Sequence, residues 1–148
     1  MTQKPLLAAY LAAADFEHAF RALLLQHAQH LFPNISIVIT LTVYAMANGV
    51  KTPADLKRWR ACTGANANYS CMQSVKAGFI TMCDNPDDAR SKRLILTEQG
   101  HLLADHLRGV TDKQFTMLEK FTPAMAHLPD ITKLLREMVD YKMPMEWR

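Results

Sequence analysis

Cysteine, glycine, proline and long apolar runs are all scarce in this sequence. Three cysteines among 148 residues are few and odd in number, which does not fit a disulfide framework, so we expect reduced thiols and a cytoplasmic location. Five glycines and seven prolines exclude collagen-like and low-complexity chains. The longest dense apolar stretch, Leu31 to Val50, is interrupted by Pro33, Asn34, Asn48 and Gly49. About 13 usable residues remain, whereas a membrane span takes about 20, so we expect no membrane partner.

The composition that is present is that of a folded domain. Hydrophobic residues make up 49% of the chain and charged residues 21%, which suffices for a packed core and excludes disorder of the whole chain. The sequence does not contain a basic segment followed by a short apolar run and a small-residue cleavage site. We therefore expect no secretory signal. No internal repeat and no linker-like run divides the chain. We therefore expect a single domain over residues 1–148.

Positive charge is concentrated in the middle third of the chain. Val50 to Thr97 holds eight basic and four acidic residues, a formal charge of +4, whereas the remainder holds nine basic and ten acidic residues, a charge of −1. Such an excess is typical of a module that faces phosphate. A solvated surface with random clustering of charge is the alternative.

Two apolar helices are predicted before this basic region. Leu6 to Leu31 repeats apolar residues at spacings of three and four, and Pro33-Asn34 ends the run. Ile35 to Ala47 is rich in β-branched residues, which favour a strand, but its length and its apolar stripe favour a buried helix. We predict a helix that Asn48-Gly49 ends.

A helix-turn-helix and a hairpin follow. Thr52-Pro53-Ala54-Asp55 has the residues of a helix start, with the helix running to about Ala61. Thr63-Gly64 breaks it, and a second short helix spans about Ala65 to Ala77. Strands are predicted at Phe79 to Cys83 and Arg93 to Leu96, on either side of the turn-forming Asn85-Pro86-Asp87-Asp88.

The last third is again helical. Thr97 is the expected cap of a helix whose apolar positions continue to Phe121, Pro123 interrupts it, and a final helix spans about Pro129 to Tyr141.

This order predicts a mainly α fold with a small β-hairpin wing: a winged helix-turn-helix over residues 35–97, flanked by N- and C-terminal dimerisation helices over residues 1–34 and 98–148. The outer helices are too apolar for a monomer of this size, so we expect them to pack against a second copy. The candidate dimerisation residues are their apolar side chains: Leu7, Leu11, Phe16, Phe20, Ile131, Leu134, Leu135 and Met138.

The middle third resembles the multiple antibiotic resistance regulator (MarR) family of bacterial winged-helix repressors. The family's wing pattern is Asp/Asn-Pro-x-Asp-x-Arg, a short variable stretch, then Leu-Thr-x-x-Gly. The sequence reads Asn-Pro-Asp-Asp-Ala-Arg at 85–90 and Leu-Thr-Glu-Gln-Gly at 96–100. Thr52-Pro53-Ala54-Asp55-Leu56 looks like the family's Thr-x-x-Glu/Asp-Leu helix start. Gly78-Phe79-Ile80 looks like its exit from the recognition helix.

The resemblance implies a non-enzymatic, cytoplasmic homodimer, associated with the nucleoid when bound, that represses transcription by binding double-stranded DNA at a near-palindromic operator. It also implies a small aromatic effector held between the dimer helices and the winged helix, which shifts the protein away from its DNA-binding form. The candidate effector-binding residues are Tyr10, His18, Tyr44 and Met46. The alternative is a winged helix that serves protein interaction or architecture and recognises no operator.

The candidate DNA-binding residues lie at the first helix cap, on the second helix and on the wing: Thr52, Asn66, Asn68, Tyr69, Ser70, Gln73, Lys76, Asp88, Arg90, Ser91 and Lys92. The amides of Asn68 and Gln73 suit adenine edges, and Tyr69 suits a thymine methyl group or a phosphate. Arg90 is expected in the minor groove, with Asp88 holding the turn through a charged hydrogen bond. The recognition helix has no arginine, unlike that of many family members, so we expect A·T-rich sites.

Other chemistries are disfavoured. Cys62, Cys71 and Cys83 do not match the position of the family's peroxide-sensing cysteine, and Cys71 is interpreted as a core residue beside Met72 and Val75. The six histidines lack the cysteine or carboxylate spacing of a zinc site. No phosphate-binding glycine loop or catalytic set is present, so we expect no metal, no cofactor and no enzymatic activity.

Overall fold

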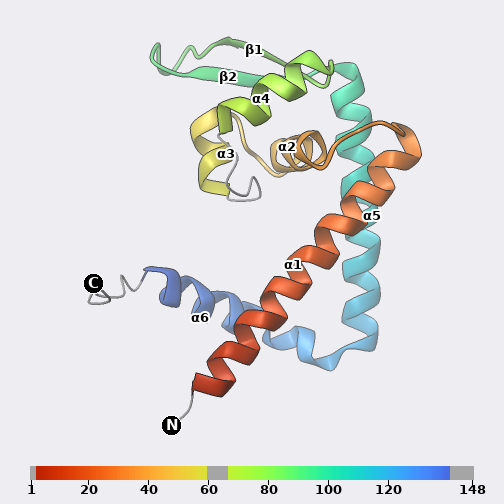
Figure 1. Cartoon of the computed structure of the whole chain (residues 1–148), viewed down its shortest axis with the longest axis vertical. Helices are drawn as coiled ribbons and strands as arrows, with labels where there is room; N and C mark the ends of the chain where they lie inside the picture. The colour runs from red at the N-terminus through yellow and green to blue at the C-terminus, as the bar shows by residue number, and fades with distance from the viewer. Residues whose placement is uncertain (1–2, 60–66, 141–148) are drawn as a thin grey trace. The chain divides into compact units, whose positions relative to one another are not determined.

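The computed structural model describes residues 3–59 and 67–140, without the side chains of residues 3, 4, 6 and 138–140. It contains two compact units, Met1–Val110 and Thr111–Arg148 (Figure 1). The predicted helix limits near Ala61 and Ala65, the turn at Thr63-Gly64, Asn66 and Cys62 lie outside the described residues. The division into one domain stays a prediction, and each unit is treated separately below.

The first unit begins with the two predicted helices, α1 (Gln3–Leu31) and α2 (Ile37–Ala47). Their ends match the prediction, whereas α1 starts three residues earlier and α2 two residues later than expected. Ser36 caps α2 by accepting a hydrogen bond from the amide of Ile39 at 3.4 Å. The hydroxyls of Thr40 and Thr42 donate to the carbonyls of Ser36 and Val38, at 2.9 and 2.8 Å, so these buried threonines satisfy their own polar groups within the helix. The β-branched segment is therefore able to form a buried helix rather than a strand.

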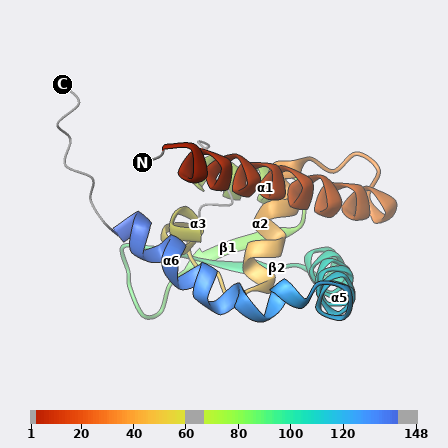
Figure 2. The same cartoon turned by 90° about the horizontal axis from the view of Figure 1, so that it is seen from below.

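Helix α2 is the centre of this unit. Every side chain from Ile39 to Ala45 is buried, and the helix contacts α1, α3 (Pro53–Trp59), α4 (Ala67–Lys76) and the wing. Figure 1 shows α2 end-on and Figure 2 shows it lengthwise. Because no residue of α2 is fully exposed, α4 packs against a helix that is buried or half-buried along its whole length and has mostly apolar side chains.

The predicted cap of α3 is confirmed in detail. The Thr52 hydroxyl accepts from the amide of Asp55, and the Asp55 carboxylate accepts from the amide of Thr52, both at 3.1 Å. This reciprocal pair is a capping box. The side-chain hydrogen bond between the Thr52 hydroxyl and the Asp55 carboxylate is the main reason that the pKa of Asp55 lies below its ordinary value.

The wing consists of β1 (Ile80–Asp84) and β2 (Lys92–Leu96), paired antiparallel with Ile80 opposite Leu96 and Asp84 opposite Lys92. Each strand begins or ends one residue from its predicted limit. The amide of Leu94 also donates to the carbonyl of Lys51 at 2.8 Å, which ties the entrance of α3 to the wing.

Helix α5 (Glu98–Phe121) begins in the first unit, where Leu103, Ala104 and Leu107 are buried, and ends in the second. The second unit continues with a 3₁₀ helix, η1 (Pro123–His127), and ends with α6 (Leu128–Asp140). The interruption at Pro123 was predicted, but the 3₁₀ turn was not. None of the helices in the described part of the chain combines the length and apolarity needed to cross a bilayer.

Candidate nucleic-acid interface

Helix α4 has one buried face and one exposed face. Ala67, Ser70, Cys71 and Ser74 are buried, at the spacing of a single helical stripe. The opposite face bears the exposed side chains of Asn68, Tyr69, Met72 and Lys76, with Gln73 half-buried beside them. Four predicted DNA-binding residues, Asn68, Tyr69, Gln73 and Lys76, thus share one outward surface.

Ser70 requires a correction. Its side chain is fully buried on the core face of α4, and its carbonyl accepts a hydrogen bond from the Ser74 hydroxyl at 2.8 Å. The helical period places position 70 about 160° from position 72 around the axis, so both cannot face outward. Ser70 is therefore removed from the set of candidate DNA contacts.

Met72 was missed by the sequence analysis, which named it only as a neighbour of the core residue Cys71. Its side chain is 57% exposed, whereas Cys71 is fully buried as predicted. The signal was present in the sequence: Met72 lies four residues after Asn68 and four before Lys76, on the polar side of the helix.

Gly78 and Thr97 fix the end of α4 relative to the wing and α5. Gly78 ends α4 with a φ of 83°, a conformation that glycine adopts at little cost. The Thr97 hydroxyl donates to the Gly78 carbonyl at 2.6 Å and accepts from the Gly100 amide at 3.1 Å. One threonine therefore caps α5 and joins it to the end of α4.

The turn at the tip of the wing is closed by side-chain oxygens. Asn85 Oδ1 accepts from the amide of Asp87 at 3.1 Å, and Asp88 Oδ1 accepts from the amide of Arg90 at 3.0 Å. Asp88 thus holds the turn as predicted, and it does so through the backbone of Arg90. The side-chain amide of Asn85 donates a hydrogen bond to the hydroxyl of Ser91 at 2.8 Å, so Ser91 also helps to close the turn.

Two basic residues of the wing differ in their surroundings. Lys92 forms an ion pair with Asp84 across the strands, which raises the pKa of Lys92 and lowers that of Asp84 through their hydrogen bond and charge attraction. Arg90 is exposed, and its guanidinium has no carboxylate within ion-pair distance among the described residues. Arg90 is therefore the freer of the two to meet an external anion.

Exposed cations lie on α4 and on the elements that contact it, α3 and the wing. They lie before and within α3, at the end of α4 and on the wing: Lys51, Lys57, Arg58, Lys76, Arg90 and Lys92. Arg58 is paired with Asp55 at 3.2 Å. Thr52, also predicted to contact DNA, is half-buried and its hydroxyl is used in the capping box. The arrangement is a polar helix face with positive charge on the elements that contact the helix, which suits a phosphate-bearing duplex.

Comparison with known proteins identifies the fold. No protein-family model matches the chain, and no curated protein matches its sequence. Among solved structures, the chain is similar to a mutant MarR from E. coli complexed with operator DNA, with 19% identity over 89% of this chain and 94% of that chain and a TM-score of 0.64. It is also similar to S. aureus MepR in a DNA complex, with 18% identity over 87% and 96% of the two chains and a TM-score of 0.64. The chain has the fold of the MarR-family regulators.

A third structure with the MarR fold is the organohalide-sensing regulator RdhR bound to 2,4-dichlorophenol. It is 15% identical over 99% of this chain and 85% of that chain, with a TM-score of 0.65. TM-scores of 0.64–0.65 over most of the chain establish the shared fold at identities of only 15–19%, and the resemblance noted in the sequence is confirmed at that level.

The four candidate effector residues of this MarR fold lie in different surroundings. Tyr10 and His18 are exposed on α1, and Met46 is half-buried at the end of α2. Tyr44 is buried, with its ring edge-on to Phe20 and Trp59 at centroid distances of 5.8 Å.

None of these four residues lines the cavity of about 320 Å³ found in the first unit. That cavity lies where the α1–α2 connection meets the end of α4 and the start of α5, and its lining includes Phe32, Ile39, Ala77, Phe79 and Gln99.

Three histidines gather between α1 and α5 of the first unit. The ring centroid of His27 lies 5.8 Å from that of His30 and 6.0 Å from that of His106. Burial of His27, followed by the charges of His106 and His30, holds its pKa below the ordinary value. Within the described residues, no group of three or more histidine, cysteine or acidic side chains is placed to hold a metal ion.

Proposed function

We propose that this chain is a DNA-binding transcription regulator that acts as a homodimeric repressor on a near-palindromic operator. The observation that carries the proposal is the outward polar face of α4, together with the exposed cations on the two elements that contact α4, α3 and the wing. The MarR fold supports it, because two proteins with this fold are seen in complexes with DNA.

The two parts of the interface have different roles in this proposal. Asn68 and Gln73 hydrogen-bond base edges in the major groove, because their amides match adenine bidentately. Arg90, held at the wing tip by the turn around Asp88, enters the minor groove and neutralises phosphate charge. Base contacts supply specificity, and the wing supplies affinity for any duplex.

The test is binding of the wild type and single variants to a selected duplex and to random duplexes over a salt series. Arg90→Ala should weaken binding to both and reduce the log–log salt slope by about one. Asn68→Ala or Gln73→Ala should weaken the binding free energy by about 1–3 kcal/mol on the selected duplex and by much less on random DNA. Arg136→Ala, which removes an exposed arginine of α6, is the matched control and should change neither.

If Arg90→Ala left the affinities for the selected and the random duplexes unchanged, the wing would not contact DNA. The alternative function, a winged helix for protein interaction or architecture, would then replace this proposal.

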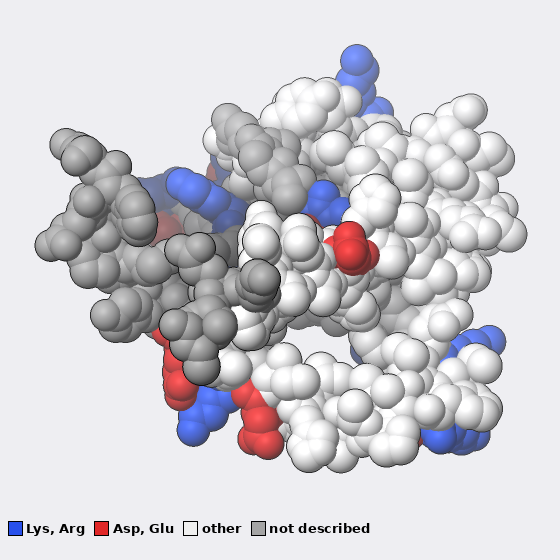
Figure 3. Space-filling model, turned by 60° about the horizontal axis from the view of Figure 1, so that its bottom comes forward, with Lys and Arg blue, Asp and Glu red and all other residues white. Residues whose placement is uncertain are grey.

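The homodimer part of the proposal rests on apolar side chains that each unit leaves exposed. On α1, Leu7, Leu11 and Phe16 are 51–59% exposed, while Phe20 is half-buried. On α6, Ile131, Leu134 and Leu135 are 46–56% exposed, and the side chain of Met138 lies outside the described residues. Among the described residues drawn in Figure 3, Lys, Arg, Asp and Glu are scattered and most of the surface belongs to other residues. Exposure of this kind is typical of helices that a partner covers.

The effector part rests on the neighbour that binds 2,4-dichlorophenol and on the cavity at the end of α4. A ligand there would act on the recognition helix directly, whereas one held by Tyr10, His18, Tyr44 and Met46 would act through α1 and α2. A phenol screen by thermal unfolding should find a stabilising compound. Ile39→Phe should abolish the effect if the cavity is the site, and Tyr10→Ala should abolish it if the α1 and α2 residues are. A screen without a stabilising compound would indicate a regulator without an effector.

A further inference from the structure

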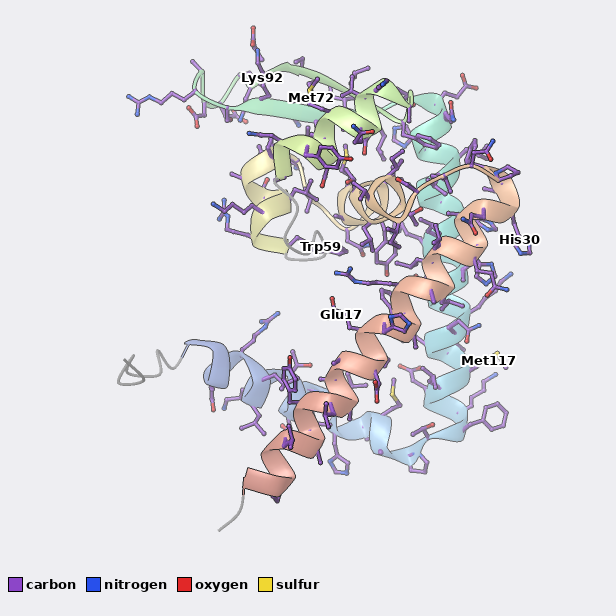
Figure 4. The ribbon with its side chains drawn as sticks, viewed as in Figure 1. Glu17, His30, Trp59, Met72, Lys92 and Met117 are labelled. Atoms are coloured by element: carbon purple, nitrogen blue, oxygen red, sulfur yellow. The ribbon has the colours of Figure 1, made fainter. Side chains whose placement is uncertain are left out.

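Met72 is an apolar side chain on the otherwise polar outward face of the recognition helix. It is 57% exposed, and Tyr69, one helical turn before it, is 54% exposed. The core face of α4 is filled by Ala67, Ser70, Cys71 and Ser74, so Met72 has no place in the core. Figure 4 shows Met72 and Lys92 at the same end of the first unit, the end formed by α4 and the wing.

The neighbours of Met72 on this face are amides and a cation. Asn68 and Tyr69 lie four and three residues before it, Gln73 follows it, and Lys76 lies four residues after it, so all five share one face of the helix. This face thus presents an apolar patch, Tyr69 and Met72, with an amide on either side. Helix α4 contains no arginine, and Lys76 at its last position is its only cation.

This combination matches the major-groove edge of an A·T base pair. Adenine offers a hydrogen-bond donor and acceptor that an amide fits, and thymine offers a C5 methyl group, the one apolar group on any base edge in that groove. A guanine edge would call for arginine or lysine, and α4 has only Lys76 at its end.

We propose that Met72, supported by Tyr69, recognises thymine by contact with its C5 methyl group in the major groove. This inference rests on the proposed DNA-binding function and deepens it, because it names the feature of the operator that the helix reads. Methionine suits the role because its unbranched thioether adapts its shape to the surface it meets.

The experiment uses the full chain and the duplex that it selects from a random pool. Each thymine in turn is replaced by uracil, which removes only the methyl group, and by 5-bromouracil, which restores apolar bulk at C5. Wild-type protein should lose about fourfold in affinity with uracil at one or more positions, the effect of one buried methyl group. Bromouracil should restore that affinity.

Met72→Ala should bind the thymine duplex about as weakly as the wild type binds the uracil duplex, and should no longer distinguish the two. Met117→Ala, which removes a similarly exposed methionine of α5 (Figure 4), should keep the full discrimination. Because Met72 is exposed, thermal unfolding of Met72→Ala should match that of the wild type.

Two results would overturn the inference while leaving the DNA-binding proposal intact. One is a wild type that binds its selected duplex but tolerates uracil at every position, and the other is a Met72→Ala variant that keeps full discrimination. A wild type that binds no duplex above the random pool would overturn both proposals together.

Discussion

Gly100 shows how a single residue can be constrained by a contact distant in the sequence. A Cβ atom added at this position would lie 2.0 Å from the carbonyl oxygen of Phe79, which is backbone and cannot move aside easily. The same carbonyl accepts the amide of Thr97 at 3.0 Å, so the start of α5 is held against the exit of α4. The glycine of the Leu-Thr-x-x-Gly pattern is therefore required by close packing.

Gly100→Ala should lower the free energy of unfolding by at least about 3 kcal/mol, because the added methyl group forces the backbone of α5 away from Phe79. Gly109→Ala is the control: it lies in the same helix with open space around its Cβ position. It should raise stability by about 0.5–1 kcal/mol through helix propensity. Urea unfolding measures both, and equal stability of the two variants would contradict the packing argument.

His27 should make stability depend on pH. Its pKa in the folded chain lies below the ordinary value of 6.5 because of burial and the neighbouring His106 and His30. The unfolded chain therefore takes up a proton first as the pH falls through about 6.5, and the free energy of unfolding decreases until the folded pKa is passed.

Measuring the free energy of unfolding between pH 8 and pH 5 tests this prediction. The His27→Gln variant should show a weaker pH dependence of stability than the wild type. An identical pH slope in His27→Gln and the wild type would show that other groups cause it.

At the scale of elements, the ends of helices follow from neighbouring residues. The capping box at Thr52 and Asp55 joins groups three residues apart, so the sequence was sufficient to predict it.

Thr52→Ala should cost about 1 kcal/mol in unfolding free energy by leaving the amide of Asp55 without its acceptor. Thr52→Ser keeps the hydroxyl and should match the wild type within about 0.5 kcal/mol. If Thr52→Ser were as unstable as Thr52→Ala, the methyl group of Thr52 rather than its capping hydrogen bond would be the source of the stability.

The exposed face of an element is harder to predict than its ends. In α2 the length and the apolar stripe correctly outweighed the β-branched composition, since the buried threonines satisfy themselves within the helix. In α4, side-chain type was misleading at two positions: the polar Ser70 is buried and the apolar Met72 is exposed. Residue type favours one side only on average, whereas the register of the helix against α2 places each side chain.

At the scale of the whole molecule, the exposed apolar residues of α1 and α6 predict a dimer. Sedimentation equilibrium should give about twice the chain mass of 16.7 kDa. Leu134→Asp should lower it toward the monomer mass by placing a charge within the apolar stripe of α6, where an interface would bury it. Thr132→Asp adds the same charge beside that stripe and should remain dimeric. A wild type that is monomeric at micromolar concentration would contradict the dimer.

Interactions between residues close in sequence were enough to specify much of this protein. The caps of α2 and α3 and the turn of the wing each join groups within six residues of one another. The cap of α3, the turn and the glycine that ends α4 were predicted from residue type and spacing, whereas Ser36 was not predicted as the cap of α2. The winged-helix order of elements followed from them.

Packing between distant segments was needed for the rest. The contact of Gly100 with Phe79, the gathering of His27 with His106, and the outward position of Met72 depend on how helices and strands meet in space. Such contacts join residues that are far apart in the sequence. The residue periodicities of helices (3.6) and strands (2) therefore do not predict them. The outward face of α4, on which the proposed reading of DNA depends, is for this reason a property of the folded chain.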